Sequence, residues 1–428
     1  MRLGGRLQAA IEILQSIENH HRPVASALKD WGSSHRFAGS GDRSAIGNIV
    51  YDALRMKLSH AYMMDDDSPF AVAHAVLFRQ WGVTPAELLE QFDGDKFAPE
   101  IISDAALATF AAQDITKAED HVQADIPEWL VSEFKLAFGD QWLDEAVAMT
   151  ARAPVDLRTN TLKVSRDKAL DALSRTGAEA TELAPFGMRV APSIGAQRSP
   201  NVVSDIPFAK GWFEVQDEGS QLASAMTLVK DTDQVLDYCA GGGGKTLALS
   251  AAMENTGQIH AYDSDTRRMA PMIERLRRAG TRNVQLCETP EMLDQLIDHC
   301  DNVLVDAPCS GTGTWRRRPD TKWRLSERSL DQRIEQQKEV IEGGSQYVKK
   351  GGCLTYVTCS VLPQENDQIV SAFLAENPEF SLVDLSNDWC RITGQETAPK
   401  SHEDFGLLCS PKRTETDGFY ISRLKRNS

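Results

Sequence analysis

The sequence has no Cys-x-x-Cys pair and no cysteine–histidine spacing of the zinc-binding kind, although it contains eight cysteines. A zinc site is therefore not expected, nor is another metal. No uncharged apolar run is long enough to cross a membrane. The amino-terminal region lacks the continuous apolar core of a signal peptide, because Glu12 and Glu18 interrupt it. These absences predict a cytoplasmic protein with reduced, free thiols and no membrane partner.

Positive charge is also scarce. The chain has 46 Lys and Arg against 62 Asp and Glu, which gives a formal net charge of −16. This balance argues against a protein that coats nucleic acid through its bulk charge, but it leaves room for a local basic surface. What the chain does have is size and apolar content. Its 428 residues, 41% of them hydrophobic, predict two or three domains with proper cores, and we expect a monomer.

Three segments differ in their patterning. Residues 1–125 repeat apolar side chains at helical spacing, as at Leu3, Leu7 and Leu14, and predict a helical domain. Residues 126–230 mix helical and strand-like patterns and predict a small α+β module. Residues 231–428 alternate strands and helices, which predicts a doubly wound α/β sheet. Acidic residues crowd residues 65–145, so that stretch is not expected to grip phosphate.

The third segment allows its elements to be placed. The composition predicts strands at residues 235–238, 259–262, 284–287, 303–306, 354–358, 380–383 and 418–424. It predicts helices at residues 247–253, 266–279, 291–297, 327–349 and 364–376.

Two of these strands end in a thiol. Asp306-Ala-Pro-Cys309 follows one apolar run, and Cys359 follows another. Ligands of an open α/β sheet bind beyond the carboxyl ends of its strands, so both thiols are expected at one crevice. A buried, unreactive cysteine is the ordinary role of any single thiol. The shared placement favours covalent chemistry for this pair, and the other six cysteines are interpreted as structural.

A glycine-rich loop follows the first strand of the α/β segment. It consists of Cys239, Ala240, Gly241, Gly242, Gly243, Gly244 and Lys245, and Asp263 ends the next strand. Such a loop brings backbone N–H groups close to an anionic or nucleotide-like ligand, and the acid suits ribose hydroxyls. A phosphate-binding P-loop requires a glycine where Cys239 stands, and G-x-G-x-x-G also fails. A plain tight turn has the same appearance, but the acid and the two thiols favour an S-adenosylmethionine loop.

A basic cluster follows Cys309. It contains Arg316, Arg317, Arg318, Lys322 and Arg324. An RNA backbone is expected to run here, with Trp315 and Trp323 stacking on bases. The alternative is a charged helix start whose tryptophans belong to the core.

The motifs in this half resemble those of the RNA 5-methylcytosine methyltransferases of the Sun/Fmu (RsmB) type. The resemblance rests on Asp306-Ala-Pro-Cys309-Ser-Gly-Thr-Gly, on Arg318-Pro-Asp-Thr-Lys-Trp and on Thr358-Cys359-Ser-Val-Leu-Pro-Gln-Glu-Asn. Upstream, Val215-Gln-Asp-Glu-Gly-Ser-Gln and Arg158-Thr-Asn-Thr-Leu resemble the module that precedes the catalytic domain in that family. Asp42-Arg43 and Val50-Tyr-Asp-Ala-Leu-Arg are similar to its NusB-like helical domain.

The resemblance implies a Rossmann-like methyltransferase domain that uses S-adenosylmethionine. It implies that Cys359 adds to carbon 6 of a cytosine, that Cys309 assists release, and that Asp306 holds the base and borders the methyl end of the cofactor. It also implies that residues 239–245 and Asp263 bind the cofactor. The implied substrate is small-subunit ribosomal RNA. Transfer RNA, or a catalytically silent ribosome-assembly factor that only binds RNA, are the alternatives.

The chain departs from that family at two places. The family loop usually reads Ala-Pro-Gly-Gly-Lys, whereas here Gly241-Gly-Gly-Gly-Lys245 lacks the proline. The family also tends to have an aspartate near the adenine after the third strand. This chain has Cys287-Glu288 there, so Glu288 is the candidate for that contact.

Overall fold

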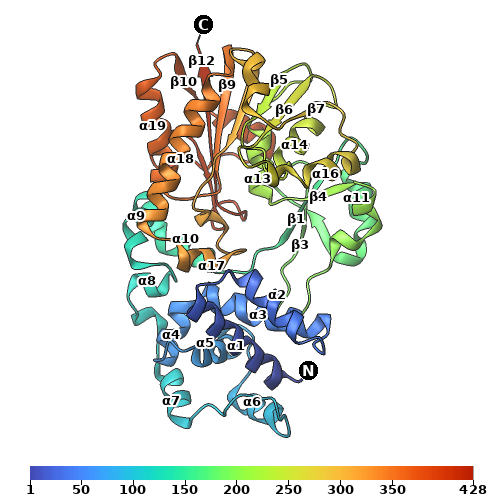
Figure 1. The fold of residues 1–428 in the computed structure, drawn as a ribbon. Helices are drawn as coiled ribbons and strands as arrows, with labels where there is room; N and C mark the ends of the chain where they lie inside the picture. Colours follow the sequence, from blue (N-terminus) through green and yellow to red (C-terminus); the bar gives the residue numbers. More distant parts are fainter. Residues whose placement is uncertain (428) are drawn as a thin grey trace.

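The structure is a computed structural model that describes residues 1–427 of the chain. A helical region lies at the bottom of Figure 1 with the amino terminus, and a large sheet stands at the top with the carboxyl terminus. A small sheet in green lies at one side of the large one. Among residues 1–427, no helix combines the length and apolarity that a membrane span requires.

The helical region packs its first, third and fifth helices into one core. Leu7, which belongs to the predicted helical pattern, is fully buried there together with Ile49 and Leu77. Ser68 caps the fifth helix by accepting from the N–H of Ala71. The helices are α1 (Leu3–His20), α2 (Val24–Ser34), α3 (Ser40–Arg55), α4 (Lys57–Met64), α5 (Pro69–Arg79), α6 (Pro85–Phe92), α7 (Asp104–Ala112) and α8 (Asp120–Gln123).

The next segment forms a four-stranded antiparallel sheet in the order β2-β3-β1-β4, preceded by two short helices. Leu157, Met188 and Phe213 are fully buried in its core. We call this segment the small module. Its elements are α9 (Val131–Phe138), α10 (Trp142–Ala148), β1 (Val155–Thr159), α11 (Arg166–Ala172), β2 (Ala178–Ala180), β3 (Gly187–Val190), α12 (Ile206–Ala209) and β4 (Phe213–Val215).

The large sheet has the order β10-β12-β9-β8-β5-β6-β7, with β11 paired to β12. Its strands are β5 (Gln234–Asp237), β6 (Gln258–Tyr262), β7 (Val284–Cys287), β8 (Cys300–Asp306), β9 (Val348–Thr358), β10 (Phe380–Val383), β11 (Leu407–Cys409) and β12 (Phe419–Arg426). The strands from β9 to β7 run parallel, and β12 runs antiparallel to β9. The predicted Rossmann-like class is confirmed.

The order of the strands fixes where a ligand binds. The chain leaves β5 toward β6 and β7 on one side and returns to β8 on the other, so the order reverses at β5. Such a switch point opens a crevice at the carboxyl ends of the strands. The helices of this part of the chain are α13 (Glu218–Ala225), α14 (Gly244–Ala252), α15 (Thr266–Met269), α16 (Met272–Ala279), α17 (Pro319–Arg324), α18 (Glu327–Ser345), α19 (Asp367–Glu376) and α20 (Ser386–Thr393).

Several predicted bounds are wrong for local reasons. The helix expected at 266–279 is divided into α15 and α16 next to Pro271, whose ring cannot donate a helical hydrogen bond. The helix expected at 291–297 is a 3₁₀ helix over Pro290–Leu296. The helix expected to reach residue 349 ends at Ser345, and β9 already begins at Val348. Gly351, with φ of 78°, therefore lies inside the strand as an irregularity.

Candidate active site

Two sulfur atoms meet at the carboxyl edge of the large sheet. Cys309 follows β8 and Cys359 follows β9, and these strands are parallel neighbours. The Sγ atoms of the two cysteines are 3.3 Å apart, and both residues are partly exposed. The crevice that the sequence predicts therefore holds two free thiols in direct contact.

The turn that carries Cys309 is held from both sides. The N–H of Ser310 donates to Glu365 Oε1 at 2.7 Å, and the Ser310 hydroxyl donates to the same carboxylate. Gln337 Nε2 donates to Glu365 Oε1 at 2.9 Å and to the Pro308 carbonyl at 3.0 Å. Glu365 and Gln337 are fully buried. The residues before and after Cys309 are thus fixed by one glutamate–glutamine pair.

The turn that carries Cys359 is tied to the same loop. The N–H of Gly313 donates to the Cys359 carbonyl at 3.0 Å, and the hydroxyls of Thr312 and Ser360 are 2.9 Å apart. A Cβ on Gly313 would meet the Gly418 carbonyl oxygen at 2.2 Å, so only glycine fits there. Both thiols accordingly lie on turns with little freedom to move.

The two sulfurs differ in their charged surroundings. The Cys359 sulfur and the Glu365 carboxylate, together with burial, raise the pKa of Cys309 well above its ordinary value, so Cys309 remains a thiol. Lys245 Nζ lies 2.7 Å from Asp306 Oδ2. Burial acts to lower the pKa of Lys245, but Asp306 and the Cys359 sulfur outweigh it, so the pKa of Lys245 is raised. Lys245 is thus the cation next to the Cys359 sulfur. The geometry therefore fits a Cys309 S–H that donates to a Cys359 sulfur.

The glycine loop lies at the switch point, between β5 and α14. Gly241 and Gly243 have φ of 50° and 80°, which glycine adopts without strain. Asp263 follows β6, and its carboxylate accepts from the N–H of Gly241 at 2.9 Å and pairs with Arg268 at 3.0 Å. The first N–H groups of α14 have no helical partner.

This crevice suits a cationic nucleoside. Asp263 and Asp306 each follow or end a strand here, and Arg268 and Lys245 are their opposing charges. Carboxylates accept from ribose hydroxyls and attract a sulfonium, which are two features of S-adenosylmethionine. The loop and its acids therefore fit that cofactor. Cys239 is partly buried beside these acids, and burial first and the acids second raise its pKa above the ordinary value.

Glu288 is less engaged than the other predicted cofactor residues. It follows β7, is exposed, and lies one residue beyond Cys287, which is buried. Ala240 and Gly242, in contrast, lie within the loop itself, where the Gly242 carbonyl accepts from Arg275. Glu288 stays a predicted adenine contact.

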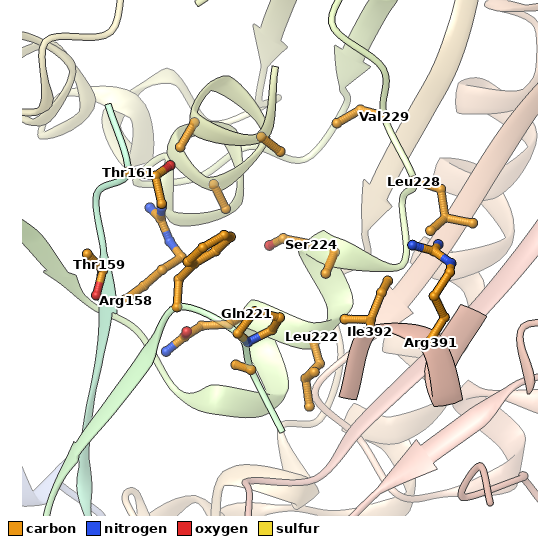
Figure 2. Close-up of a pocket in the computed structure, with 17 residues that line it drawn as sticks. Arg158, Thr159, Thr161, Gln221, Leu222, Ser224, Leu228, Val229, Arg391 and Ile392 are labelled. Atoms are coloured by element: carbon orange, nitrogen blue, oxygen red, sulfur yellow. The ribbon is translucent and has the colours of Figure 1, made fainter. Parts of the chain in front are cut away.

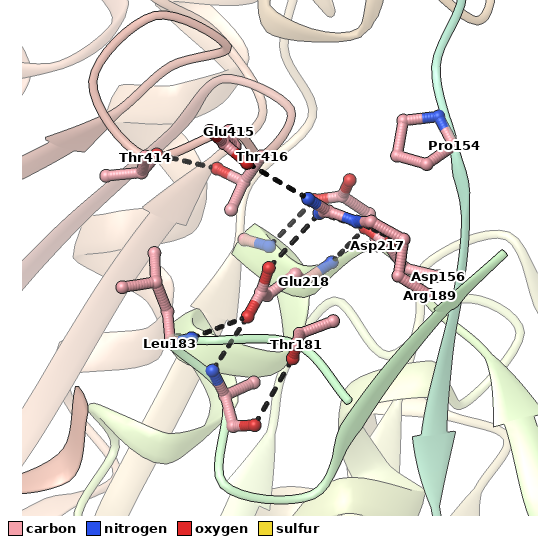
Figure 3. Close-up of polar contacts among 12 residues, drawn as sticks. Pro154, Asp156, Thr181, Leu183, Arg189, Asp217, Glu218, Thr414, Glu415 and Thr416 are labelled. Carbon is pink, nitrogen blue, oxygen red and sulfur yellow. Dashed lines mark hydrogen bonds and ion pairs between the residues drawn. The ribbon is translucent and has the colours of Figure 1, made fainter. Parts of the chain in front are cut away.

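The basic cluster after Cys309 divides into two groups. Arg316 and Arg317 pair with Asp417, and Arg317 Nη2 also lies 2.8 Å from Asp217 Oδ2. Figure 3 shows Asp217 next to the module's own ion pair between Arg189 and Asp156. These arginines join the small module to the large sheet and do not face solvent as a pair of free cations.

Lys322 has a similar internal role. It is 2% exposed, and its ammonium donates to the Arg55 carbonyl in the helical region at 2.9 Å. The Trp323 indole donates to the Leu54 carbonyl at 2.7 Å. Trp315 is fully buried and stacks on Phe134 with ring centroids 5.9 Å apart. Segment 315–323 is therefore a docking segment for the helical region.

These contacts bear on the predicted RNA surface. Arg316 and Lys322 are buried, Arg317 is partly exposed, and each contacts an acid or a carbonyl of the protein. All three stay predictions as phosphate contacts. Arg318 and Arg324 are exposed and stay predicted RNA contacts. The sequence motif Arg318-Pro-Asp-Thr-Lys-Trp is thus largely a structural motif.

Two residues that support the sulfurs were not singled out from the sequence. Glu365 belongs to the motif that follows Cys359, so a signal was present, but its role depends on a fold that brings it to Ser310, 55 residues earlier in the chain. Gln337 lies on α18 among many exposed polar residues, and nothing in its neighbourhood marks it.

Comparisons with known proteins agree with this geometry. A family model described as 16S rRNA methyltransferase RsmB/F matches residues 225–425. A model described as the RsmF/B-like, ferredoxin-like domain matches residues 126–194. Both turns that carry the sulfurs, and the glycine loop, lie within the first match.

Individual relatives give the same result. The ribosomal RNA small subunit methyltransferase B of Klebsiella pneumoniae is 32% identical over 301 residues, which are 70% of this chain and 65% of that protein. A probable protein of the same name from Synechocystis is 30% identical, over 71% of this chain and 67% of that protein. The chain thus spans 65% of the first relative's length. The crystal structure of PH0851 has the same fold, with a TM-score of 0.74 and 24% identity over 99% of this chain and all of that one.

Proposed function

The chain belongs to the RsmB/F methyltransferase family, and on that premise we propose that it methylates carbon 5 of a cytosine in small-subunit ribosomal RNA. Methyltransferases of this family use S-adenosylmethionine, which supplies an electrophilic methyl group. The observation that carries the proposal is the 3.3 Å contact between Cys309 and Cys359. A single structural thiol explains neither the contact nor its place at the cofactor crevice.

Carbon 5 of cytosine is a poor nucleophile, so the protein must supply a nucleophile that activates the ring. Attack of the Cys359 thiolate on carbon 6 forms a carbon–sulfur bond and moves the ring electrons toward carbon 5, which then takes the methyl group. Lys245 is the cation beside that sulfur, and Asp306 borders the same space. Asp306 is partly exposed and suits a hydrogen bond from the exocyclic amine of the base.

The product is then released by elimination. The proton on carbon 5 must leave, its electrons restore the ring double bond, and the bond between carbon 6 and the Cys359 sulfur breaks. Cys309, a thiol in contact with that sulfur, is placed to donate its proton to the Cys359 sulfur as it departs, and the Cys309 thiolate so formed takes the proton from carbon 5. Its surroundings keep it protonated at the start, so its role belongs to this last step.

A methyl-transfer assay tests the proposal. Purified protein is incubated with S-adenosylmethionine labelled in the methyl group and with small-subunit ribosomal RNA, naked or assembled, or with transfer RNA. We expect label in small-subunit ribosomal RNA alone, released on digestion as 5-methylcytidine. Label in transfer RNA would show that transfer RNA is the substrate. The absence of label in any RNA, despite cofactor binding, would favour a catalytically silent assembly factor.

A further inference from the structure

A cavity of about 350 Å³ lies between the small module and the helices that cover the large sheet. Figure 2 shows side chains of β1, α13 and α20 around it. None of its lining residues comes from the glycine loop at 239–245 or from the turns that carry Cys309 and Cys359. The cavity is therefore separate from the candidate active site.

One charge inside the cavity lacks an anion. Arg158 is 6% exposed, and its Nε donates to Gln216 Oε1 at 2.7 Å. Among residues 1–427, no side chain or carbonyl accepts from its Nη1 or Nη2. Glu214, its neighbour across the sheet, is already paired with Arg275 and Arg278. A buried guanidinium with a neutral partner is costly unless an anion joins it.

The rest of the lining suits a flat, largely apolar body. No aspartate or glutamate lines the cavity, and its second charge is Arg391 at the rim. The walls include the small side chains Ala225, Ala248 and Ala251 of α13 and α14. The volume falls in the range of small-molecule sites, about 300–1,000 Å³.

Two unpaired polar atoms lie just beneath those walls, and the hydroxyl of Thr161 lines the cavity. Gln221 Oε1 and Thr159 Oγ1 are buried and have no hydrogen-bond partner among the described residues. Figure 2 shows the Arg158 side chain extending toward Thr161, whose hydroxyl also lines the space. Convergent polar groups in a mainly apolar cavity are the mark of a ligand site.

We propose that this cavity binds a nucleoside monophosphate unit, with the phosphate on Arg158 and the base against α13 and α14. A guanidinium with two free nitrogens matches two phosphate oxygens, and the apolar walls with the Thr161 hydroxyl at their edge match a base. The unit comes either from a free mononucleotide or from a nucleotide of bound RNA. Only the second source rests on the proposed function.

The first arm of the test measures AMP binding by calorimetry with S-adenosylhomocysteine saturating, so that the cofactor crevice is closed to AMP. We expect AMP to bind roughly tenfold or more tightly than adenosine or inorganic phosphate, because charge-assisted pairs and apolar contact act together. Ala248→Phe fills the cavity and should abolish binding. Ala372→Phe, at an exposed alanine of α19, is the matched control and should bind as wild type does.

Arg158→Gln tests the phosphate position and should weaken AMP binding roughly tenfold while leaving adenosine binding unchanged. If that variant does not fold, Ala248→Phe still decides. AMP binding that is absent at millimolar concentration, or that survives Ala248→Phe, overturns the proposal.

The second arm identifies the source by measuring RNA affinity of the Ala248→Phe and Ala372→Phe proteins. Weaker RNA binding in the first alone, together with competition by AMP, assigns the cavity to a nucleotide of RNA. Equal RNA binding in both, with AMP binding lost in the first, assigns it to a free mononucleotide.

Discussion

Glu365 is the residue on which the position of Cys309 depends. Its carboxylate accepts from Ser310 and Gln337 and has no exposure to solvent. A buried carboxylate that accepts several hydrogen bonds fixes a turn more firmly than neutral contacts do. Its charge also raises the pKa of Cys309, after the larger effects of the Cys359 sulfur and burial.

Glu365→Gln keeps the shape of the side chain and removes its charge. We expect turnover to fall roughly tenfold, because a charge-assisted hydrogen bond contributes about 1.5–3 kcal/mol. The pKa of Cys309 should fall, so the limb of the pH–rate profile that reports it should move to lower pH. Glu376→Gln, at an exposed position of α19, is the control and should leave rate and profile unchanged. If the pH–rate profile of Glu365→Gln did not shift, the role of the glutamate would be purely structural.

Asp237 gives a pH dependence of stability. Burial, followed by the charges of Asp306 and Asp263, raises its pKa to about 7, although Thr246 and Lys245 act in the other direction. The folded protein therefore holds this proton up to near neutral pH, whereas the unfolded chain releases it near pH 4. Between these values the folded state binds more protons, so its stability falls as pH rises.

Asp237→Asn removes this titration and keeps an acceptor for the Thr246 hydroxyl. We expect the free energy of unfolding of the variant, relative to that of wild type, to increase by roughly 1–3 kcal/mol from pH 5 to pH 8. Urea unfolding at both pH values measures the difference. Asp231→Asn, at an exposed site just before β5, should show no such gain. If the free energy of unfolding changed with pH in the same way in Asp237→Asn and wild type, the buried carboxyl would be ionised at both pH values.

At the scale of elements, the glycine loop shows which of its residues must be glycine. Gly243 has φ of 80°, and a Cβ there would meet Met272 Cγ of α16 at 2.6 Å. Gly244 opens α14, and its nearest neighbour to a Cβ is Arg275 Nη2 at 3.9 Å. Adjacent glycines in one loop thus have different tolerance for a side chain.

Gly243→Ala is expected to weaken S-adenosylmethionine binding roughly tenfold or more and to cost about 1–2 kcal/mol of stability, through backbone strain and the Met272 clash. Gly244→Ala should bind the cofactor as wild type does. Calorimetric titration of both proteins with the cofactor checks this. Equal affinities would show that the backbone at residue 243 does not shape the cofactor crevice.

The elements of the large sheet were predictable where the pattern is local. The runs at 284–287 and 380–383 gave strands with those bounds, because each is a short apolar or β-branched run between breakers. The start of β9 was predicted wrongly, because Gly351 lies inside this strand, whereas a glycine usually ends an element. The pairing of Glu365 with Ser310 was not predictable, because no local pattern reports a contact between distant turns.

At the scale of the whole molecule, segment 315–323 connects the parts. Lys322 and Trp323 donate to carbonyls at the end of α3, and Arg317 reaches Asp217 in front of α13. A sequence shows such side chains only as a basic cluster with tryptophans. Whether they face RNA or another domain depends on long-range packing. The predicted alternative, a charged helix start with core tryptophans, therefore describes most of this segment.

The prediction of an RNA contact is tested at the exposed arginines of the basic cluster, Arg318 and Arg324. Changing Arg318 and Arg324 together to alanine should weaken RNA binding and lower the slope of log affinity against log salt by about 1–2, because phosphate contacts release counterions. Lys425→Ala, at an exposed position near the end of β12, should change neither the affinity nor the slope. An unaltered slope in the double variant would remove this surface from the RNA interface.

The most direct measurement on the two sulfurs is the amount of protein linked covalently to RNA during turnover. Wild-type, Cys359→Ala and Cys309→Ala proteins are incubated with RNA and S-adenosylmethionine and separated on a denaturing gel. We expect a protein–RNA adduct to accumulate in Cys309→Ala and none to form in Cys359→Ala, because Cys359 makes the bond and Cys309 assists its breakage. An adduct in Cys359→Ala that is absent from Cys309→Ala would reverse the roles, and no adduct in any of the three would contradict covalent catalysis by this pair.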